Sequence, residues 1–282
     1  MSKNEVFLDT SIQIARAIHS RKTKEWIKSR IENYSGTVTS LIVRQEYKRR
    51  FLKEAAYLLN LFNEKQSFAK VQRHVTDRLT FRHQRKQKIN LETLTTILEG
   101  SSDDDLTERS VRYLRALLRL GLSEFDAGVD EIIDDSGCAC AKLPIIEDEP
   151  YKRYRFGTDK CSKTLGACGI IEFIKVRKYD LYRVQNKLRS LNEKTDELRR
   201  AEEFIQKVLD GPDAANSYNP CLKFGDLIIA LESVNVSVFY TLNGKESQHF
   251  CRALNQNLVV RPTNDDLEDE VCLIGDEEWK KF

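Results

Sequence analysis

Four segments of the chain carry an acidic residue at the start or end of an apolar stretch. Asp9 closes the run Val6-Phe7-Leu8, which indicates a buried strand that would deliver the carboxylate to the exposed edge of a sheet. Glu46, Asp226 and Glu246 belong to three later segments of the same kind. Carboxylates that converge on one crevice repel one another unless a divalent cation neutralises them. The pattern therefore predicts a site for Mg²⁺ or Mn²⁺.

Such a site suits the hydrolysis of phosphodiester bonds. Attack of hydroxide on a phosphodiester builds up negative charge, and a metal ion both lowers the pKa of bound water and offsets that charge. The sequence has neither a Gly-x-Ser-x-Gly nor a Gly-Lys-Ser/Thr signature, so a serine triad and a P-loop are not indicated. The four histidines show no metal-ligand spacing.

The contexts of the four acids carry a family resemblance. They are Phe7-Leu8-Asp9-Thr10-Ser11, Ser40-Leu41-Ile42-Val43 leading to Glu46, Gly225-Asp226-Leu227-Ile228-Ile229-Ala230, and Thr241-x-Asn243-x-x-Glu246. In order and context they resemble the successive motifs of PIN-domain nucleases, the group that contains VapC-like toxins. The resemblance implies a three-layer α/β/α fold with a central parallel sheet. It also implies a nuclease that uses metal-activated water, with RNA favoured over DNA.

Carried over residue by residue, the resemblance makes Asp9, Glu46 and Asp226 the primary catalytic and metal-binding acids. At the fourth position many family members have Asp two residues after the threonine, or three residues beyond that. This chain has Asn243 and Glu246 in those places. We expect Glu246 to bind the metal directly or through water, Asn243 to contribute hydrogen bonds, and Thr241 to belong to the cofactor-binding set.

Each acid taken singly has a structural explanation. Asp226 ahead of an apolar run suits an N-cap, and Glu46 between Arg44 and Lys48 suits a surface ion pair. The alternative function is a catalytically inactive PIN-like scaffold that binds nucleic acid or a protein partner, which the non-Asp fourth position permits. A further alternative is a helical, zinc-stapled interaction protein in which the α/β ends are incidental.

The order of expected elements predicts a split α/β domain. A strand at 5–9 precedes a helix capped by Thr10 or Ser11, and a second helix covers 23–34. A strand at 36–39 precedes a helix capped by Ser40 and reaching about residue 62, which starts a parallel sheet. Strand patterns return only at 235–241 and 257–260.

Between these parts the chain has helical periodicity, apart from the irregular stretch 134–170. We therefore assign residues 1–63 and 211–264 to one discontinuous PIN-like domain and residues 64–210 to a large, mainly helical insertion. Residues 265–282 form an acidic tail.

Four of the seven cysteines gather in the irregular stretch. Four thiolates can hold Zn²⁺ and staple a loop that lacks its own core, although neither pair has Cys-x-x-Cys spacing. The alternative is that they are small buried apolar residues. The candidate zinc ligands are Cys138, Cys140, Cys161 and Cys168.

A basic stretch supplies the candidate nucleic-acid contacts. On one helix His74, Arg78, Arg82 and Arg85 would recur every three or four residues and share a face suited to tracking phosphates. We expect Arg78, Arg82, Arg85 and Lys86 to contact nucleic acid, with a solvated face or a contact with the acidic tail as the alternative.

Composition bounds the remaining possibilities. The 46 basic and 44 acidic residues leave a net charge of +2, so only the local distribution of charge can attract a polyanion. No apolar run approaches the roughly 20 residues of a membrane span, and the N-terminus lacks a signal-peptide core, so we expect a cytoplasmic protein. The amphipathic segment 179–209 indicates helix packing, with self-association or binding of a protein partner such as an antitoxin as further roles.

Overall fold

A five-stranded sheet lies at the centre of the computed structural model, which describes residues 4–79, 84–99, 106–148, 153–156, 168–211 and 220–260. Its strands lie in the order β3-β2-β1-β6-β7, and every neighbouring pair is parallel. Their bounds are β1 (Glu5–Leu8), β2 (Gly36–Ser40), β3 (Glu131–Ile133), β6 (Val238–Thr241) and β7 (Asn257–Val260). The expected α/β class with a central parallel sheet is therefore confirmed.

The strand order reverses beside β1. The chain proceeds from β1 through β2 to β3 on one side, and β6 and β7 are added on the other side. In open parallel sheets, ligands bind outside the carboxyl ends of the strands at such a reversal. Asp9 directly follows β1, and its backbone N–H donates to Tyr240 O on β6 at 3.1 Å. The sequence thus delivers Asp9 to this switch point.

Both faces of the sheet are buried because successive residues of its strands are apolar and point to opposite faces. Phe7 and Phe239 stack at 5.3 Å on the face that belongs to the larger core. That core includes side chains of α3 (Leu41–Glu46), α13 (Gly225–Glu232) and α14 (Gly244–Ala253). Val6 and Leu8 point to the opposite face, where they pack with α1 (Thr10–Ile18) and α2 (Arg21–Ile31). Helices therefore cover the sheet on both faces.

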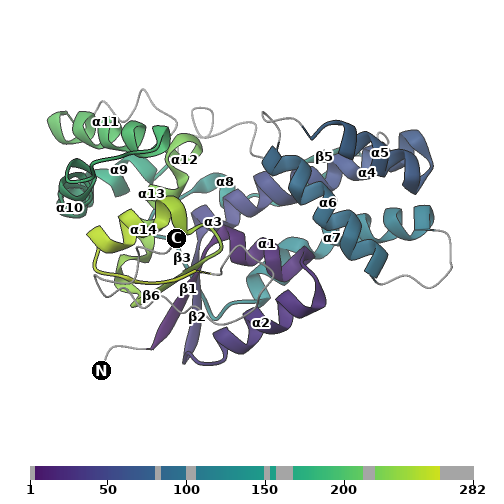
Figure 1. Cartoon of the computed structure of the whole chain (residues 1–282), viewed down its shortest axis with the longest axis horizontal. Helices are drawn as coiled ribbons and strands as arrows, with labels where there is room; N and C mark the ends of the chain where they lie inside the picture. The colour runs from purple at the N-terminus through teal and green to yellow at the C-terminus, as the bar shows by residue number, and fades with distance from the viewer. Residues whose placement is uncertain are drawn as a thin grey trace.

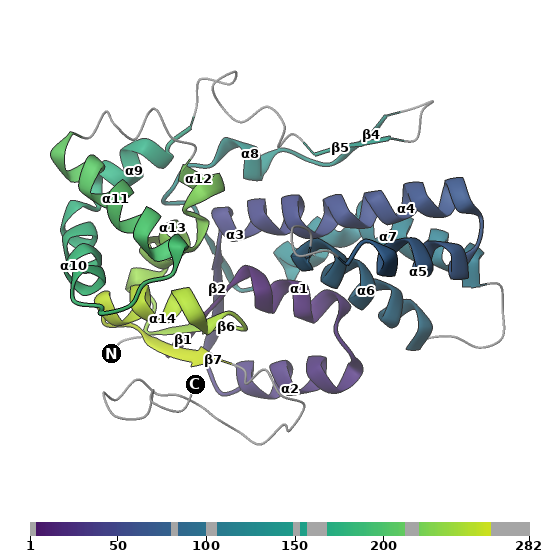
Figure 2. The same cartoon turned by 45° about the horizontal axis from the view of Figure 1, so that its top comes forward.

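Two groups of helices flank this centre on opposite sides (Figures 1 and 2). One group is α4 (Lys53–Lys65), α5 (Phe68–Asp77), α6 (Gln84–Glu99) and α7 (Leu106–Ala127). The other is α9 (Ile170–Val176), α10 (Lys178–Arg189), α11 (Asp196–Asp210) and α12 (Pro220–Lys223). In the described part of the chain, none of the helices has both the length and the apolar character needed to cross a membrane.

The segment expected to be one helix from Ser40 to about residue 62 is helical throughout. Ser40 is the cap, and its Oγ accepts the Val43 N–H at 3.3 Å. Between α3 and α4 lies a π-helical segment, η1 (Tyr47–Leu52). Interruptions of this type occur often at functional sites, because they change which side chains share a face.

The expectation that sheet strands return only at residue 235 is wrong. β3 lies inside the range assigned to the helical insertion, yet it pairs with β2 as the edge strand of the sheet. A strand of three residues is too short to show alternation in the sequence. The same range also contains α8 (Ala139–Lys142) and an antiparallel pair of short strands, β4 (Ile146–Asp148) and β5 (Arg153–Arg155). Outside this range, a 3₁₀ turn, η3 (Ser233–Asn235), follows α13.

Candidate active site

Asp9 is held by donors from two sides of the switch point. Its Oδ1 accepts the Thr10 N–H at 2.6 Å, and its Oδ2 accepts the hydroxyls of Ser11 at 2.9 Å and Thr241 at 2.7 Å. The helix cap expected at Thr10 or Ser11 is therefore Asp9 itself, since its carboxylate reaches the first helical N–H. Only 8% of Asp9 is exposed, so its carboxylate is fixed rather than solvated.

Glu46, the last residue of α3, lies beside Asp9. The Thr10 hydroxyl donates to Glu46 Oε2 at 3.1 Å, so one residue contacts both acids. Arg50 Nη2 donates to Glu46 Oε1 at 3.0 Å, and Arg49 Nη2 lies 3.6 Å from the same oxygen. Glu46 is 1% exposed. It forms a buried ion pair, unlike the surface pair considered from the sequence.

The neighbours considered for that surface pair have other partners. Arg44 pairs with Asp126 at 2.7 Å, and Lys48 Nζ donates to the carbonyls of Cys140 at 2.8 Å and Leu143 at 2.7 Å. Neither cation is therefore the partner of Glu46, whose nearest cations lie one turn further along the helix.

The N-terminus of α13 packs directly on Glu46. A Cβ at Gly225 would clash with Glu46 Oε1 and lie 3.3 Å from its Cδ, so only glycine permits this approach. Asp226 is the next residue and lies in the first turn of α13. The cap position belongs to Phe224, so the N-cap explanation of Asp226 is wrong. The helix dipole instead favours a negative charge there.

These three carboxylates influence one another electrostatically. Burial raises the pKa of Glu46 to about 7, the Arg50 guanidinium opposes that rise, and the charges of Asp226 and Asp9 add to it. Burial acts to lower the pKa of Arg50, but Glu46, Asp226 and Asp9 together raise it. Asp9, Glu46 and Asp226 therefore share one neighbourhood, which we call the acid cluster, with Arg50 as the common cation.

The donor chemistry of the acid cluster fits a hard divalent cation, which prefers carboxylate oxygens. Among the described side chains, however, no three His, Cys, Asp or Glu residues lie close enough together to form a ready-made metal site. Asp9 and Glu46 already accept hydrogen bonds from Thr10, and Glu46 also pairs with Arg50. The Glu246 side chain, the expected fourth ligand, lies outside the described side chains.

Thr241 and Asn243 lie beside the acid cluster, where Thr241 holds Asp9 in position. The Thr241 hydroxyl donates to Asp9 and accepts the Asn243 N–H at 2.9 Å. Thr241 is fully buried, so it orients Asp9 at the end of β6. Asn243 occupies the cap position of α14 without a side-chain capping hydrogen bond.

The structure brings two of the four zinc candidates together. The backbones of Cys138 and Cys168 pair in an isolated antiparallel β-bridge, and Cys140 is buried close by in α8. Cys161 lies outside the described residues. Cys138, Cys140 and Cys168 are free thiols, and the described side chains include no group of three potential metal ligands there.

The basic stretch does not form one continuous helical face. α5 ends at Asp77 and α6 begins at Gln84, which breaks the three-to-four-residue spacing on which the shared face depended. Arg78 Nη1 donates to the Tyr57 hydroxyl at 3.3 Å, and Lys86 lies 3.7 Å from Glu54. Arg82 and the Arg85 side chain lie outside the described part. The expected single stripe is therefore wrong.

Sequence reasoning missed Arg50, Arg49 and Gly225. Arg49 and Arg50 stand three and four residues after Glu46, the spacing at which helical side chains meet, so their sequence position could have identified them. Gly225 directly precedes Asp226, but its approach to Glu46 is a tertiary contact without a sequence signal.

In comparisons with known proteins, no family model, no curated protein and no solved structure matches the chain. A function has to be inferred from the geometry of the acid cluster.

Proposed function

We propose that the chain is a metal-dependent nuclease of PIN type that hydrolyses phosphodiester bonds, preferably in RNA. One observation carries this proposal: Asp9, Glu46 and Asp226, from three distant segments, lie in one neighbourhood around Arg50 beside the switch point of a parallel sheet, with Thr10 contacting both Asp9 and Glu46 and the start of α13 packed on Glu46. Structural acids have no need to gather in this way, because like charges in a buried site raise the free energy of the fold.

The residues of the cluster have distinct roles in this proposal. Asp9, Glu46 and Asp226 would hold a Mg²⁺ or Mn²⁺ ion, which supplies an activated water and offsets charge on the phosphate. Thr241 and Ser11 keep Asp9 in position through hydrogen bonds to Oδ2. Arg50 balances the charge of the acids and is placed to meet a phosphate oxygen when one arrives.

Cleavage of labelled single-stranded RNA and DNA, with Mg²⁺, Mn²⁺ or EDTA, tests the function. The wild-type chain should cleave only with a divalent ion. Asp9→Asn and Asp226→Asn should lose at least about a hundredfold in rate, as expected when a main source of charge stabilisation is removed. Glu32→Gln, which changes a 63% exposed glutamate at the end of α2, is the matched control and should retain activity. Equal rates in Asp9→Asn and the wild type would refute the proposal.

The second candidate is a PIN-like scaffold without catalysis, in which Arg50 permanently takes the place of the cation. It is favoured by the Glu46–Arg50 ion pair and by the lack of a ready-made three-ligand site among the described side chains. Calorimetric titration with Mn²⁺ separates the two candidates. Binding that Asp226→Asn weakens supports the nuclease, whereas no binding by the wild type supports the scaffold.

A further inference from the structure

Two cysteines lie opposite one another where the loop after β3 meets the start of α9. The backbones of Cys138 and Cys168 pair in an antiparallel bridge, and the Gly169 N–H donates to the Gly137 carbonyl at 3.2 Å. A hydrogen bond between the residue before one partner and the residue after the other marks a non-hydrogen-bonded pair, in which the Cα atoms are about 4.5 Å apart and the side chains are closest. That separation lies within the range of about 4.4–6.8 Å found in disulfides.

Glycines bring the two backbones this close. Gly137 precedes Cys138 and has a φ of +56°, and a Cβ on it would lie 3.3 Å from Gly169 Cα. A Cβ on Gly169, which follows Cys168, would lie 2.8 Å from the Ser136 carbonyl oxygen. A side chain at Gly169 would therefore push the two segments apart. The sequences Gly137-Cys138 and Cys168-Gly169 thus set the two cysteines side by side.

Contacts outside the bridge fix the segment that carries Cys138. Arg177, at the end of α9, donates from Nη2 to Asp135 Oδ2 at 3.0 Å. The Ser136 N–H donates at 3.2 Å to Oε1 of Glu232, which is fully buried at the end of α13. The segment is therefore held by α9 and by α13 at once, which keeps Cys138 facing Cys168.

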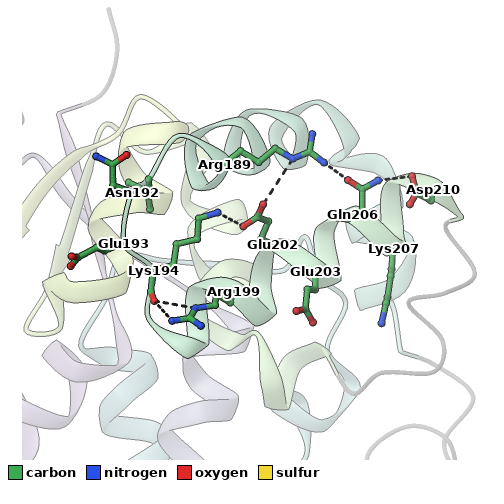
Figure 3. A pocket seen from close by; sticks show the side chains of 11 residues that line it. Arg189, Asn192, Glu193, Lys194, Arg199, Glu202, Glu203, Gln206, Lys207 and Asp210 are labelled. Atoms are coloured by element: carbon green, nitrogen blue, oxygen red, sulfur yellow. Dashed lines mark hydrogen bonds and ion pairs between the residues drawn. The ribbon is translucent and has the colours of Figure 1, made fainter.

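The segment that carries Cys168 is fixed by the helices that follow it. α9 leads through Arg177 into α10, which packs against α11. Figure 3 shows the ion pairs that join α10 and the loop after it to α11: Arg189 Nε lies 3.9 Å from Glu202 Oε1, and Lys194 Nζ lies 2.6 Å from Glu202 Oε2. A bond between the two cysteines would therefore tie this helical group to the edge of the sheet.

The two thiols differ in their access to solvent. Cys168 is half-buried, whereas Cys138 is 3% exposed, so a reagent from solvent meets Cys168 first. Lys48 is buried and its Nζ donates to the Cys140 carbonyl at 2.8 Å, which places a cation beside this segment. A nearby cation favours the thiolate, the reactive form of cysteine.

We propose that Cys138 and Cys168 form a redox modification site, at which a hydroperoxide converts the two thiols into a disulfide. The Cys168 thiolate attacks the O–O bond, becomes a sulfenic acid and releases water, or an alcohol from an organic hydroperoxide. Cys138 Sγ then attacks the Cys168 sulfur, which forms the S–S bond and releases the hydroxyl group as water. The two thiols lose two electrons to the peroxide, and their two protons end in the released molecules.

The disulfide stabilises the fold because it constrains the unfolded chain between Cys138 and Cys168. A dithiol reverses it through thiol–disulfide exchange. Neither thiol belongs to the acid cluster, so this site stands whether or not the chain cleaves nucleic acid.

Oxidation of the full chain with hydrogen peroxide, followed by alkylation and peptide mapping by mass spectrometry without reductant, tests this site. A peptide that links Cys138 to Cys168 should form, and the number of reactive thiols in the unfolded chain should fall by two from seven. The midpoint of thermal unfolding should rise by roughly 5 °C, and dithiothreitol should reverse both changes. Cys168→Ser should abolish the linked peptide and the rise in midpoint.

Cys140→Ser and Cys161→Ser are the matched controls, because each removes another thiol of the same irregular stretch. Both should form the linked peptide to the same extent as the wild type. A link from Cys168 to Cys140 or Cys161 in place of Cys138 would overturn the proposal, as would zinc that the purified chain holds and Cys168→Ser releases. Equal rates of disulfide formation in buffer and in concentrated urea would also overturn it, since the folded backbone is what brings the thiols together.

Discussion

Arg50 Nη2 donates to Glu46 Oε1 at 3.0 Å from a position four residues further along the same helical segment. The pair is buried on the Glu46 side, where Asp9 and Asp226 add two more negative charges to the neighbourhood. A single guanidinium therefore stabilises an arrangement of acids that would otherwise repel one another. Any divalent ion that binds there has to share the carboxylates with Arg50 or displace it.

Replacement of Arg50 by Gln should destabilise the protein more at pH 8 than at pH 5. At pH 8 Glu46 is ionised and loses its partner, which should cost roughly 1–3 kcal/mol in the free energy of unfolding. At pH 5 Glu46 is protonated, because its pKa is about 7, and the loss should be smaller. Urea denaturation at both pH values measures this difference.

Arg21→Gln is the control for this comparison, since Arg21 pairs with Glu25 with the same i,i+4 spacing but is 91% exposed. Solvent screens an exposed pair, so the control should show a small and pH-independent change. If Arg50→Gln behaves like the control, Arg50 does not stabilise the acids.

Glu46→Gln should remove a pH dependence of stability between about pH 4.5 and pH 7. The raised pKa means that the folded state holds the proton more tightly than the unfolded state. The resulting stability is fully present below the ordinary pKa of 4.5 and is lost as the pH rises to about 7. Glutamine imitates the protonated acid, so the variant should match the wild type at pH 4.5.

At pH 8 the Glu46→Gln variant should exceed the wild type by up to roughly 3 kcal/mol. Glu232 is also buried with a pKa of about 7, so the wild type and the Glu46→Gln variant share the pH dependence of stability that Glu232 causes. The difference between the two unfolding curves isolates Glu46. A constant difference from pH 4.5 to pH 8 would show that Glu46 does not titrate in this range.

The sequence was sufficient for the elements with long or clearly patterned signals. The apolar run before Asp9 predicted β1, and the pattern at 257–260 predicted β7. β3 was missed because three residues cannot show alternation, and its place depends on pairing with β2. The prediction of a single basic helix face was wrong because it assumed continuous helical spacing where the chain breaks between α5 and α6.

The acid cluster was likewise predictable only in part. The apolar run before Asp9 indicated that this acid lies at the carboxyl edge of a parallel sheet. Glu46 and Asp226 lie on the helices α3 and α13, and only the resemblance to the family's motifs indicated that they belong with Asp9. The hydrogen-bond donors and cations that hold them come from tertiary packing. Gly225 illustrates this limit, since its role depends on how closely α13 approaches Glu46.

Gly225→Ala should disrupt the site with a limited effect on the fold. The new Cβ would clash with Glu46 Oε1, so the carboxylate or the start of α13 has to move. Overpacking of this kind costs typically about 1–3 kcal/mol. We expect a loss of Mn²⁺ affinity, measured by calorimetry, that exceeds the loss in a control, Gly211→Ala, where a Cβ meets nothing within 4 Å. Unchanged Mn²⁺ binding in Gly225→Ala would place the metal away from Glu46.

Thr241→Val should release Asp9 while preserving the shape of the core. The substitution removes the hydroxyl that donates to Asp9 Oδ2 at 2.7 Å and accepts the Asn243 N–H at 2.9 Å. Leaving buried polar partners unsatisfied costs about 1–3 kcal/mol, which urea denaturation would detect. Because Asp9 then loses its orientation, Mn²⁺ binding should also weaken.

Thr241→Ser restores the hydroxyl and removes only a methyl group, so it separates the hydrogen bond from packing. We expect it to recover most of the Mn²⁺ affinity that Thr241→Val loses, even if some stability is lost from the small cavity. If serine and valine weaken binding equally, the methyl contact rather than the hydrogen bond orients Asp9. Because Ser11 also donates to Asp9 Oδ2, Thr241→Val combined with Ser11→Ala should weaken binding further than either change alone.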